Sequence, residues 1–247
     1  MNGGILIEVC ADSIESAIAA QNGGAGRIEL CYALEIGGLT PSKGLIDYVI
    51  SHVRIPVNIL IRPRSGDFIY SADEIDLMKS DIYYAKSAGA SGIVTGILSK
   101  NATVNMQAMK ILVEASNPLP VTFHRAFDLL VDKHKALEDI ISLGCARLLT
   151  SGGFKSATTG SHIISELIKQ AGDRILIMPG AGINAKNFAE LVEATGCREF
   201  HLSASAISVN PMEHVNIHLS EVFPPDRHVS DVNEIKNICS LADILSD

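Results

Sequence analysis

The chain has 247 residues, of which 47% are hydrophobic and 19% charged, so it can bury a sizeable core and is not expected to be disordered. Its 20 Lys and Arg against 28 Asp and Glu, with no Trp, argue against nucleic acid as a partner. It has no apolar stretch long enough to span a membrane and no basic N-terminal segment of the signal-peptide kind, so we expect a cytoplasmic protein with no membrane partner.

Eight short strand-like runs alternate with helical stretches along the chain. The predicted strands are 5–10, 27–31, 57–62, 92–95, 121–124, 147–150, 175–178 and 199–203. Apolar residues at helical spacing predict helices over 13–22, 44–52, 72–88, 106–116, 134–142, 161–171 and 185–194. Eight strands alternating with helices in about 250 residues predict an α/β fold of the (β/α)8 or TIM-barrel type.

We expect one domain covering residues 1–247. The alternative, a doubly wound sheet, usually has a glycine-rich first turn, whereas the first turn here reads Cys10-Ala-Asp-Ser. Residues 231–247 predict a last helix, which no strand follows and which closes the ring. The segment 207–230, with three His and a Pro-Pro pair, is the one long irregular stretch. Its sequence is compatible with a lid over the barrel and with a linker to the last helix.

Carboxyl and thiol groups end the first two predicted strands in the same pattern. Glu8 and Cys10 are two positions apart, so they point to the same face of the first strand. Glu29 and Cys31 repeat this arrangement on the second strand. We expect all four side chains to face the barrel interior, at the end where barrels of this kind keep their chemistry.

Other strands also end in polar residues. These residues are Arg62, Arg64, His124, Arg125, Asp128, Thr150, His201 and Ser203. A purely structural barrel interior would be filled with Val, Ile and Leu instead. The convergence of carboxylates, thiols, guanidinium groups and imidazoles at one end of one barrel therefore indicates a site.

Small residues follow the seventh and eighth strands, where barrels often bind phosphate. Gly180 and Gly182 leave backbone N–H groups open next to a helix N-terminus, and Ser203 and Ser205 follow the neighbouring strand. We expect an anion there, held also by Arg62 or Arg64.

These residues also have structural interpretations. Glu8 and Glu29 can form interior ion pairs with Arg62. Free cysteines are commonly small buried hydrophobic residues, and single histidines are commonly hydrogen-bonded parts of a core. Gly180 and Gly182 can serve the turn alone.

The five cysteines are widely spaced and form no C-x-x-C motif, which is typical of reduced thiols. Cys145 and Cys197 each follow a helix-capping glycine and precede a strand, so we expect them at the opposite end of the barrel. Cys239 lies in the last predicted helix. Only Cys10 and Cys31 end neighbouring strands, which places them close enough to share one ion.

Several motifs resemble the CutC family of copper homeostasis proteins. They are Glu8-Val-Cys, Arg27-Ile-Glu-Leu-Cys, Gly37-Gly-Leu-Thr-Pro-Ser, Ile61-Arg-Pro-Arg-Ser-Gly-Asp-Phe, Val94-Thr-Gly, Pro120-Val-Thr-Phe-His-Arg-Ala-Phe-Asp, Leu149-Thr-Ser-Gly and Pro179-Gly-Ala-Gly. The resemblance runs from about residue 5 to Ser205 and resumes in the last helix. It implies a cytoplasmic single-domain TIM barrel, a homo-oligomer such as a dimer or tetramer, and an association with copper. In some members it implies Cu(I) binding through two cysteines, which match Cys10 and Cys31.

Two functions are therefore open. The first is a copper homeostasis protein that binds Cu(I) through Cys10 and Cys31, with no other cofactor. The second is an isomerase, epimerase or lyase that acts on a small phosphorylated metabolite. Its catalytic candidates are Glu8, Glu29, His124 and Asp128, and its ligand-binding candidates are Arg62, Arg64, Arg125, Thr150, Gly180, Gly182, His201, Ser203 and Ser205. No Lys lies in a predicted strand, which argues against a Schiff-base aldolase.

Overall fold

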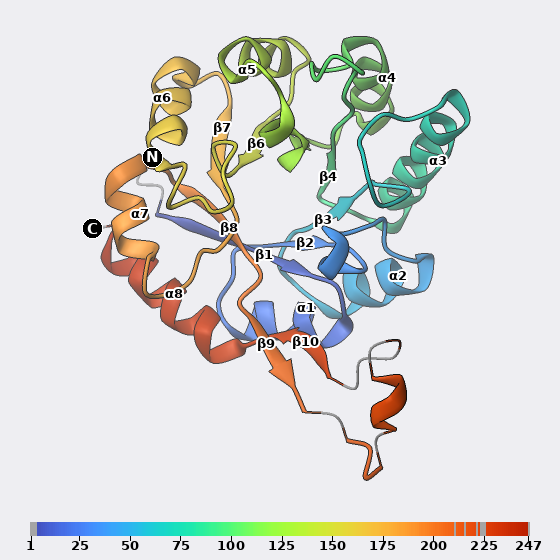
Figure 1. The fold of residues 1–247 in the computed structure, drawn as a ribbon, viewed down its shortest axis with the longest axis vertical. Coiled ribbons are helices and arrows are strands. Elements are labelled where there is room, and N and C mark those ends of the chain that lie inside the picture. The colour runs from blue at the N-terminus through green and yellow to red at the C-terminus, as the bar shows by residue number, and fades with distance from the viewer. Residues whose placement is uncertain (1–3, 210, 215, 221, 223–225, 247) are drawn as a thin grey trace.

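Eight parallel strands form a closed barrel in the computed structural model, which describes residues 4–246 except 210, 215, 221 and 223–225 (Figure 1). The strands are β1 (Leu6–Ala11), β2 (Arg27–Leu30), β3 (Val57–Leu60), β4 (Gly92–Thr95), β5 (Val121–Phe123), β6 (Arg147–Thr150), β7 (Leu176–Pro179) and β8 (Glu199–Leu202). They are hydrogen-bonded in the order β7-β6-β5-β4-β3-β2-β1-β8. A parallel bridge between Gly180 and His201 joins the two ends of this order, so the predicted (β/α)8 barrel is confirmed.

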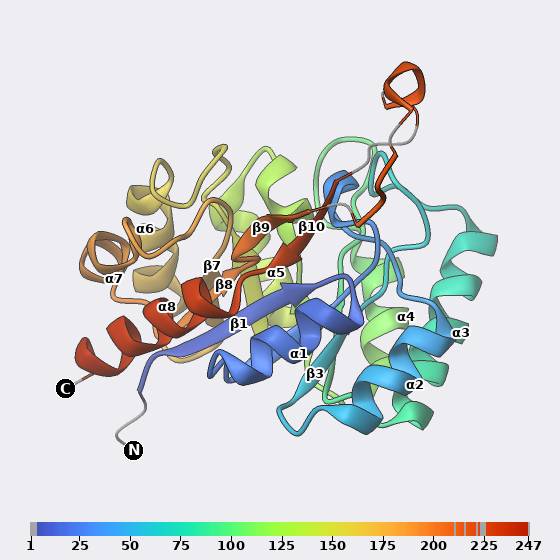
Figure 2. The ribbon, with the colours of Figure 1, turned by 90° about the horizontal axis from the view of Figure 1, so that it is seen from below.

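Helices surround the barrel on the outside (Figures 1 and 2). They are α1 (Ile14–Asn22), α2 (Lys43–His52), α3 (Ala72–Ala88), α4 (Met106–Ser116), α5 (Lys133–Ser142), α6 (Ser161–Ala171), α7 (Phe188–Thr195) and α8 (Val232–Ile244). Five of the first six begin at a polar side chain that accepts a backbone N–H bond, namely Ser13, Ser42, Ser71, Asn105 and Asp132. None of the helices in the described ranges has both the length and the apolar composition to cross a membrane.

The side chains of each strand divide between two environments, as their alternation predicts. Val9 and Leu30 are fully buried in the large apolar cluster that includes helix residues such as Ala17. Cys10 and Cys31 belong instead to a small separate cluster in the barrel interior. The inward orientation of the two thiols is therefore confirmed.

The segment expected to be irregular contains two strands. Strands β9 (Ser205–Ser208) and β10 (Arg227–Ser230) pair antiparallel, and a short 3-10 helix, η3 (Ile217–Leu219), lies between them. This two-stranded sheet is fixed to α1, because the backbone N–H of Ser230 donates to Ser16 Oγ at 3.1 Å. Beyond the paired strands the described residues project away from the barrel in both views (Figures 1 and 2).

Candidate functional site

A cavity of about 500 Å³ opens at the carboxyl ends of the barrel strands. Nine of the candidate residues line it, namely Cys10, Glu29, Arg62, His124, Arg125, Asp128, Gly182, His201 and Ser203. They come from six different strands or the loops after them, and each strand is short and buried on both faces. The barrel scaffold thus brings together residues that are as much as 193 positions apart in the sequence.

The other candidates do not line the cavity. Arg64 is bound at the surface by Glu74 at 2.6 Å and by Asp67 at 3.1 Å. Ser205 lies in β9, where its hydroxyl is 3.2 Å from a ring nitrogen of His228. Glu8, Cys31, Thr150 and Gly180 are buried and do not line it. The prediction that Gly180 leaves its backbone N–H open to an anion is wrong, because that N–H donates to the carbonyl of Thr150 at 3.0 Å.

Glu8 is the centre of a buried ion-pair network. It binds the guanidinium of Arg27, which also bonds Glu199 at 2.5 Å, and Glu8 Oε1 lies 2.8 Å from Nδ1 of His201. Burial opposes ionisation of Glu8, but the hydrogen bond and charge of His201 and the charge of Arg27 lower its pKa to about 2. Burial lowers the pKa of His201, but the charges of Glu29 and Glu8 outweigh it and raise that pKa. Glu8 therefore stays ionised and fixes the imidazole.

The structural interpretation in which Glu8 and Glu29 form ion pairs with Arg62 is wrong. Glu8 pairs with Arg27, which shares the inward face with Glu29 and could have been found from the same alternation. The guanidinium of Arg62 instead donates to the backbone carbonyls of Ile36, Gly38 and Gly66 at 2.9–3.0 Å. Arg62 holds the loops after β2 and β3 against each other at the edge of the cavity.

Glu29 is the carboxyl group that this network leaves without a cation. Its Oε1 accepts a weak hydrogen bond from the Cys10 thiol at 3.7 Å, and its buried Oε2 has no partner among the described residues. Burial raises the pKa of Glu29 to about 7; the nearby charge of Glu8 also raises it, while His201 acts in the opposite direction. Glu29 can therefore gain or lose a proton near neutral pH.

The thiol pair lies beside Glu29. The sulfurs of Cys10 and Cys31 are 3.6 Å apart, and the hydrogen bond with Cys31 together with burial raises the pKa of Cys10 well above its usual value. Cys145 and Cys197 precede β6 and β8, at the other end of the barrel, where burial raises the pKa of each to about 12. Of the described cysteines, therefore, only Cys10 and Cys31 are within reach of the same ion.

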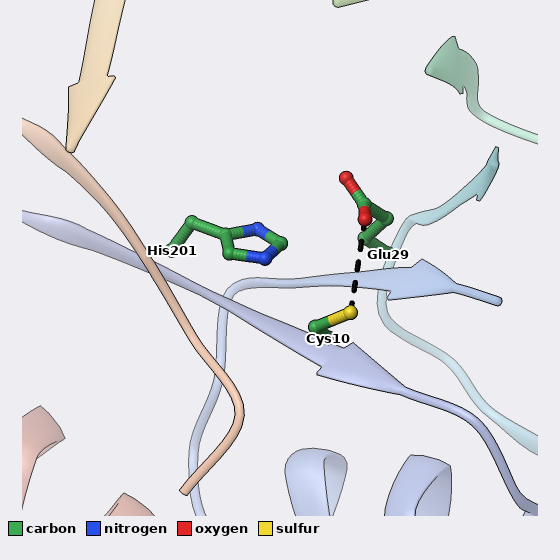
Figure 3. A group of neighbouring side chains, drawn as sticks. All are labelled: Cys10, Glu29 and His201. Atoms are coloured by element: carbon green, nitrogen blue, oxygen red, sulfur yellow. Dashed lines mark hydrogen bonds between the residues drawn. The ribbon is translucent and has the colours of Figure 1, made fainter. Parts of the chain in front are cut away.

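One sulfur, one carboxylate oxygen and one ring nitrogen form a compact group of metal-ligand atoms. They belong to Cys10, Glu29 and His201, and all lie within 4.8 Å of one another (Figure 3). All three residues are buried, and all three line the cavity.

His124 and Asp128 lie in and beside the turn after β5. His124 Nδ1 accepts the backbone N–H of Ala126 at 3.2 Å, which leaves Nε2 as the protonated ring nitrogen, and burial lowers the pKa of His124 to about 3. His124 is thus neutral at physiological pH. Asp128 accepts bonds from the hydroxyl of Thr150 at 2.5 Å and from the backbone N–H groups of Ser151 and Gly153 at 3.0 Å, so it fixes the loop after β6.

The loops after β7 and β8 contain strained backbone. Ala181 has φ 90° and Ala204 has φ 45°, conformations that residues other than glycine rarely adopt. Ala181 lines the cavity beside Gly182 and Ser203, a short turn before α7. Strain of this kind concentrates at binding sites, and this is the region for which the sequence predicts an anion.

A closed (β/α)8 barrel whose polar cavity lies at the carboxyl ends of its strands defines a TIM-barrel protein with a polar barrel mouth. The chain belongs to the CutC family, whose family model matches residues 5–206. It is 47% identical to a CutC family protein of Pasteurella multocida over 224 residues, which cover 90% of this chain and 92% of that protein. It is 49% identical to the mouse "Copper homeostasis protein cutC homolog" over 213 residues, which cover 86% and 78% of the two chains.

A crystal structure of the putative copper homeostasis protein CutC from Streptococcus agalactiae has the same fold. It superimposes with a TM-score of 0.77 at 32% identity and covers 81% of this chain and 98% of that one. This chain thus has the fold of a CutC family protein, and its polar residues converge at the mouth of that barrel.

Proposed function

We propose that this protein is an enzyme that moves a proton to or from a small metabolite bound in the barrel mouth, as an isomerase, epimerase or lyase does. The observation that carries this proposal is Glu29. A buried carboxyl with a pKa of about 7 in the wall of a cavity has the acidity that general acid–base catalysis at neutral pH requires.

The surroundings of Glu29 support a polar, anionic substrate. Neutral His124 offers a ring N–H rather than a charge, and it can polarise a substrate oxygen without competing for the proton. Gly182 and Ser203 border the cavity beside the strained residues Ala181 and Ala204, where backbone N–H groups can hold a phosphate. Arg125, on the same lining, adds a guanidinium, which bonds Asp128 at 2.8 Å and the hydroxyl of Ser151 at 3.0 Å. We therefore place the phosphate of the metabolite between the β7 and β8 loops.

The proposal is tested with a panel of sugar phosphates and other phosphorylated metabolites, followed by NMR for any protein-dependent change. Glu29→Gln keeps the size of the side chain and removes the transferable proton, so we expect turnover to fall by about 10²–10⁴-fold. Glu166→Gln, at an exposed position of α6, is the matched control. Equal turnover by parent and Glu29→Gln would contradict the assignment.

Cu(I) binding is the second candidate, and the 3.6 Å separation of the Cys10 and Cys31 sulfurs favours it. Thiolates are preferred Cu(I) ligands, and relatives of this chain carry copper in their names. We expect the double variant Cys10→Ser/Cys31→Ser to lose Cu(I) binding in competition with a colorimetric chelator under reducing conditions. The double variant of Cys145 and Cys197 is the control, and equal binding by parent and Cys10→Ser/Cys31→Ser would remove copper as a candidate.

We further propose a cytoplasmic location, where free thiols stay reduced, and a homo-oligomeric state. Light scattering on the purified protein checks the second point: a monomeric mass at micromolar concentration would contradict it.

A further inference from the structure

Three different ligand atoms converge from three neighbouring strands. Cys10, Glu29 and His201 belong to β1, β2 and β8; Cys10 pairs with Glu29 in the β1–β2 register, and β8 lies on the other side of β1. Figure 3 shows the sulfur, the carboxylate and the imidazole turned toward one another. Since all three side chains stand on strands, not loops, the scaffold itself fixes their separation.

The imidazole is oriented from behind as metal-binding histidines are. Glu8 Oε1 holds Nδ1 of His201 at 2.8 Å, which leaves the other ring nitrogen, Nε2, as the ligand atom. Glu8 is itself held by Arg27 and, at 3.4 Å, by the side-chain amide of Asn58. A carboxylate behind a histidine in this way fixes the tautomer and raises the basicity of the ligating nitrogen.

In the buried ion-pair network, Glu29 is the carboxyl group that no guanidinium neutralises. Glu8 and Glu199 are balanced by the guanidinium groups of Arg27 and Arg147, which bond them directly. Glu29 has no such partner, it is 4% exposed, and its Oε2 accepts no hydrogen bond among the described residues. A divalent cation held by Glu29 and a Cys10 thiolate would make this part of the interior neutral.

We propose that Cys10, Glu29 and His201 bind one divalent transition-metal ion of the Zn²⁺ type, with its fourth coordination position open to the cavity. Sulfur, nitrogen and oxygen ligands together are typical of Zn²⁺, whereas Cu(I) favours thiolates. A tetrahedral ion with a Zn–S bond of about 2.3 Å and a Zn–O bond of about 2.0 Å places sulfur and oxygen about 3.5 Å apart. The distance from Cys10 Sγ to Glu29 Oε1 is 3.7 Å. Three protein ligands with one open position are the arrangement of catalytic zinc sites rather than structural ones.

The metal site deepens the proposed function and rests on it only for its use in catalysis. In the metal-free protein Glu29 keeps the proton-carrying role proposed above. With the ion bound, Glu29 would be a ligand, and a water molecule on the open position, its pKa lowered to about 7, would supply or accept the proton in its place. The site shares Cys10 with the thiol pair, so Zn²⁺ and Cu(I) would exclude each other.

The experiment uses metal ions alone, added to the chelator-treated full chain. We expect one Zn²⁺ per chain by calorimetry, and with Co²⁺ we expect the intense visible bands of a tetrahedral ion together with a thiolate charge-transfer band. Cys10→Ser, Glu29→Gln and His201→Gln should each weaken Zn²⁺ binding at least 100-fold, and Glu8→Gln should weaken it 10- to 100-fold. Cys31→Ser is the matched control, because it breaks the thiol pair and leaves the three ligands in place.

Several results would overturn the metal site. These are a folded parent that binds no Zn²⁺, a Co²⁺ spectrum without a thiolate band, and Zn²⁺ binding that depends on Cys31 but not on Glu29 or His201. The Co²⁺ spectrum of Cys31→Ser, which keeps all three ligands and lacks the thiol pair, decides the question even if His201→Gln does not fold. Turnover by the chelator-treated parent that depends on Glu29 would leave the proposed enzyme intact and refute only the part of the metal ion in catalysis. Zn²⁺ binding by a parent protein that turns over no compound of the panel would support the metal site and contradict the proposed enzyme.

Discussion

The protonation of Glu29 should be visible in the stability of the protein itself. Its pKa of about 7 in the folded chain lies above the 4.5 of an unfolded glutamate, because burial disfavours the charged form. The folded protein therefore holds a proton that the unfolded chain has released between these two pH values. The stability associated with the neutral carboxyl is fully present below pH 4.5 and is lost as the pH rises to 7 and beyond.

The size of the effect on the free energy of unfolding follows from the difference between the folded and unfolded pKa of Glu29. A pKa moved from 4.5 to about 7 in a fully buried carboxyl corresponds to about 3 kcal/mol of the free energy of unfolding. Glutamine resembles the protonated glutamate, so Glu29→Gln should match the parent near pH 4.5. Above pH 7 it should be more stable by about 3 kcal/mol, which is unusual for a change in a barrel interior.

The assay is urea unfolding of parent and variant in parallel from pH 4.5 to 8, with a chelator present so that no metal ion holds the carboxylate. Glu193→Gln serves as the control, because Glu193 is exposed on α7 and has no ion pair among the described residues, and it should show no pH-dependent difference from the parent. A Glu29→Gln variant that is less stable by a constant amount at every pH would refute the reasoning. It would mean that Glu29 is an ionised structural partner in the folded protein and not the proton-carrying group of the site.

Three further predictions concern the scaffold of the site. Glu8→Gln leaves the Arg27 guanidinium with one carboxylate fewer in a buried position, so it should lower the free energy of unfolding by about 3–5 kcal/mol, measured by urea unfolding; a loss below 1 kcal/mol would contradict a truly buried pair. Asp128→Asn removes one charged acceptor from the β6 loop and should cost about 1–3 kcal/mol, whereas an unchanged melting temperature would show that the loop holds itself. Gly160→Ala would place a Cβ 1.9 Å from the backbone oxygen of Ser151, so little folded protein is expected by circular dichroism, and a native-like melt would disprove that contact.

The sequence predicts the barrel well because its signals are local. Short apolar strands and the polar caps at residues such as Ser13 and Ser71 mark the elements directly, and strand alternation places Cys10 and Cys31 inside. Strand alternation also predicts that Arg27 points inward, because it lies two residues before Glu29 on the same strand. Its partner Glu199 follows 172 residues later, and no local pattern predicts that pairing.

The roles of individual polar groups were harder to predict, since they depend on which loops approach one another. Arg62 looks from the sequence like a free cation at the mouth, but its guanidinium is bound by carbonyls of two loops whose conformations come from the folded chain. Asp128 looks like an acid–base candidate, yet its oxygens accept bonds from the loop after β6. Strands β9 and β10 could not be predicted, because each has four residues and pairs with a strand that lies about 20 residues away in the sequence.

The closure of the ring by His201 has a consequence for how the protein is made. The bond from Glu8 to His201 joins residues 193 positions apart, and the bridge from Gly180 to His201 joins the first and last strands of the hydrogen-bonded order. A growing chain on the ribosome therefore carries Cys10, Glu29 and Glu8 early but cannot assemble the site until β8 has emerged. Strands that are distant in the sequence pair slowly, because the chain between them must first lose conformational entropy. A nascent chain arrested before residue 199 lacks His201, so it should bind neither substrate nor Zn²⁺ at the site formed by Cys10, Glu29 and His201.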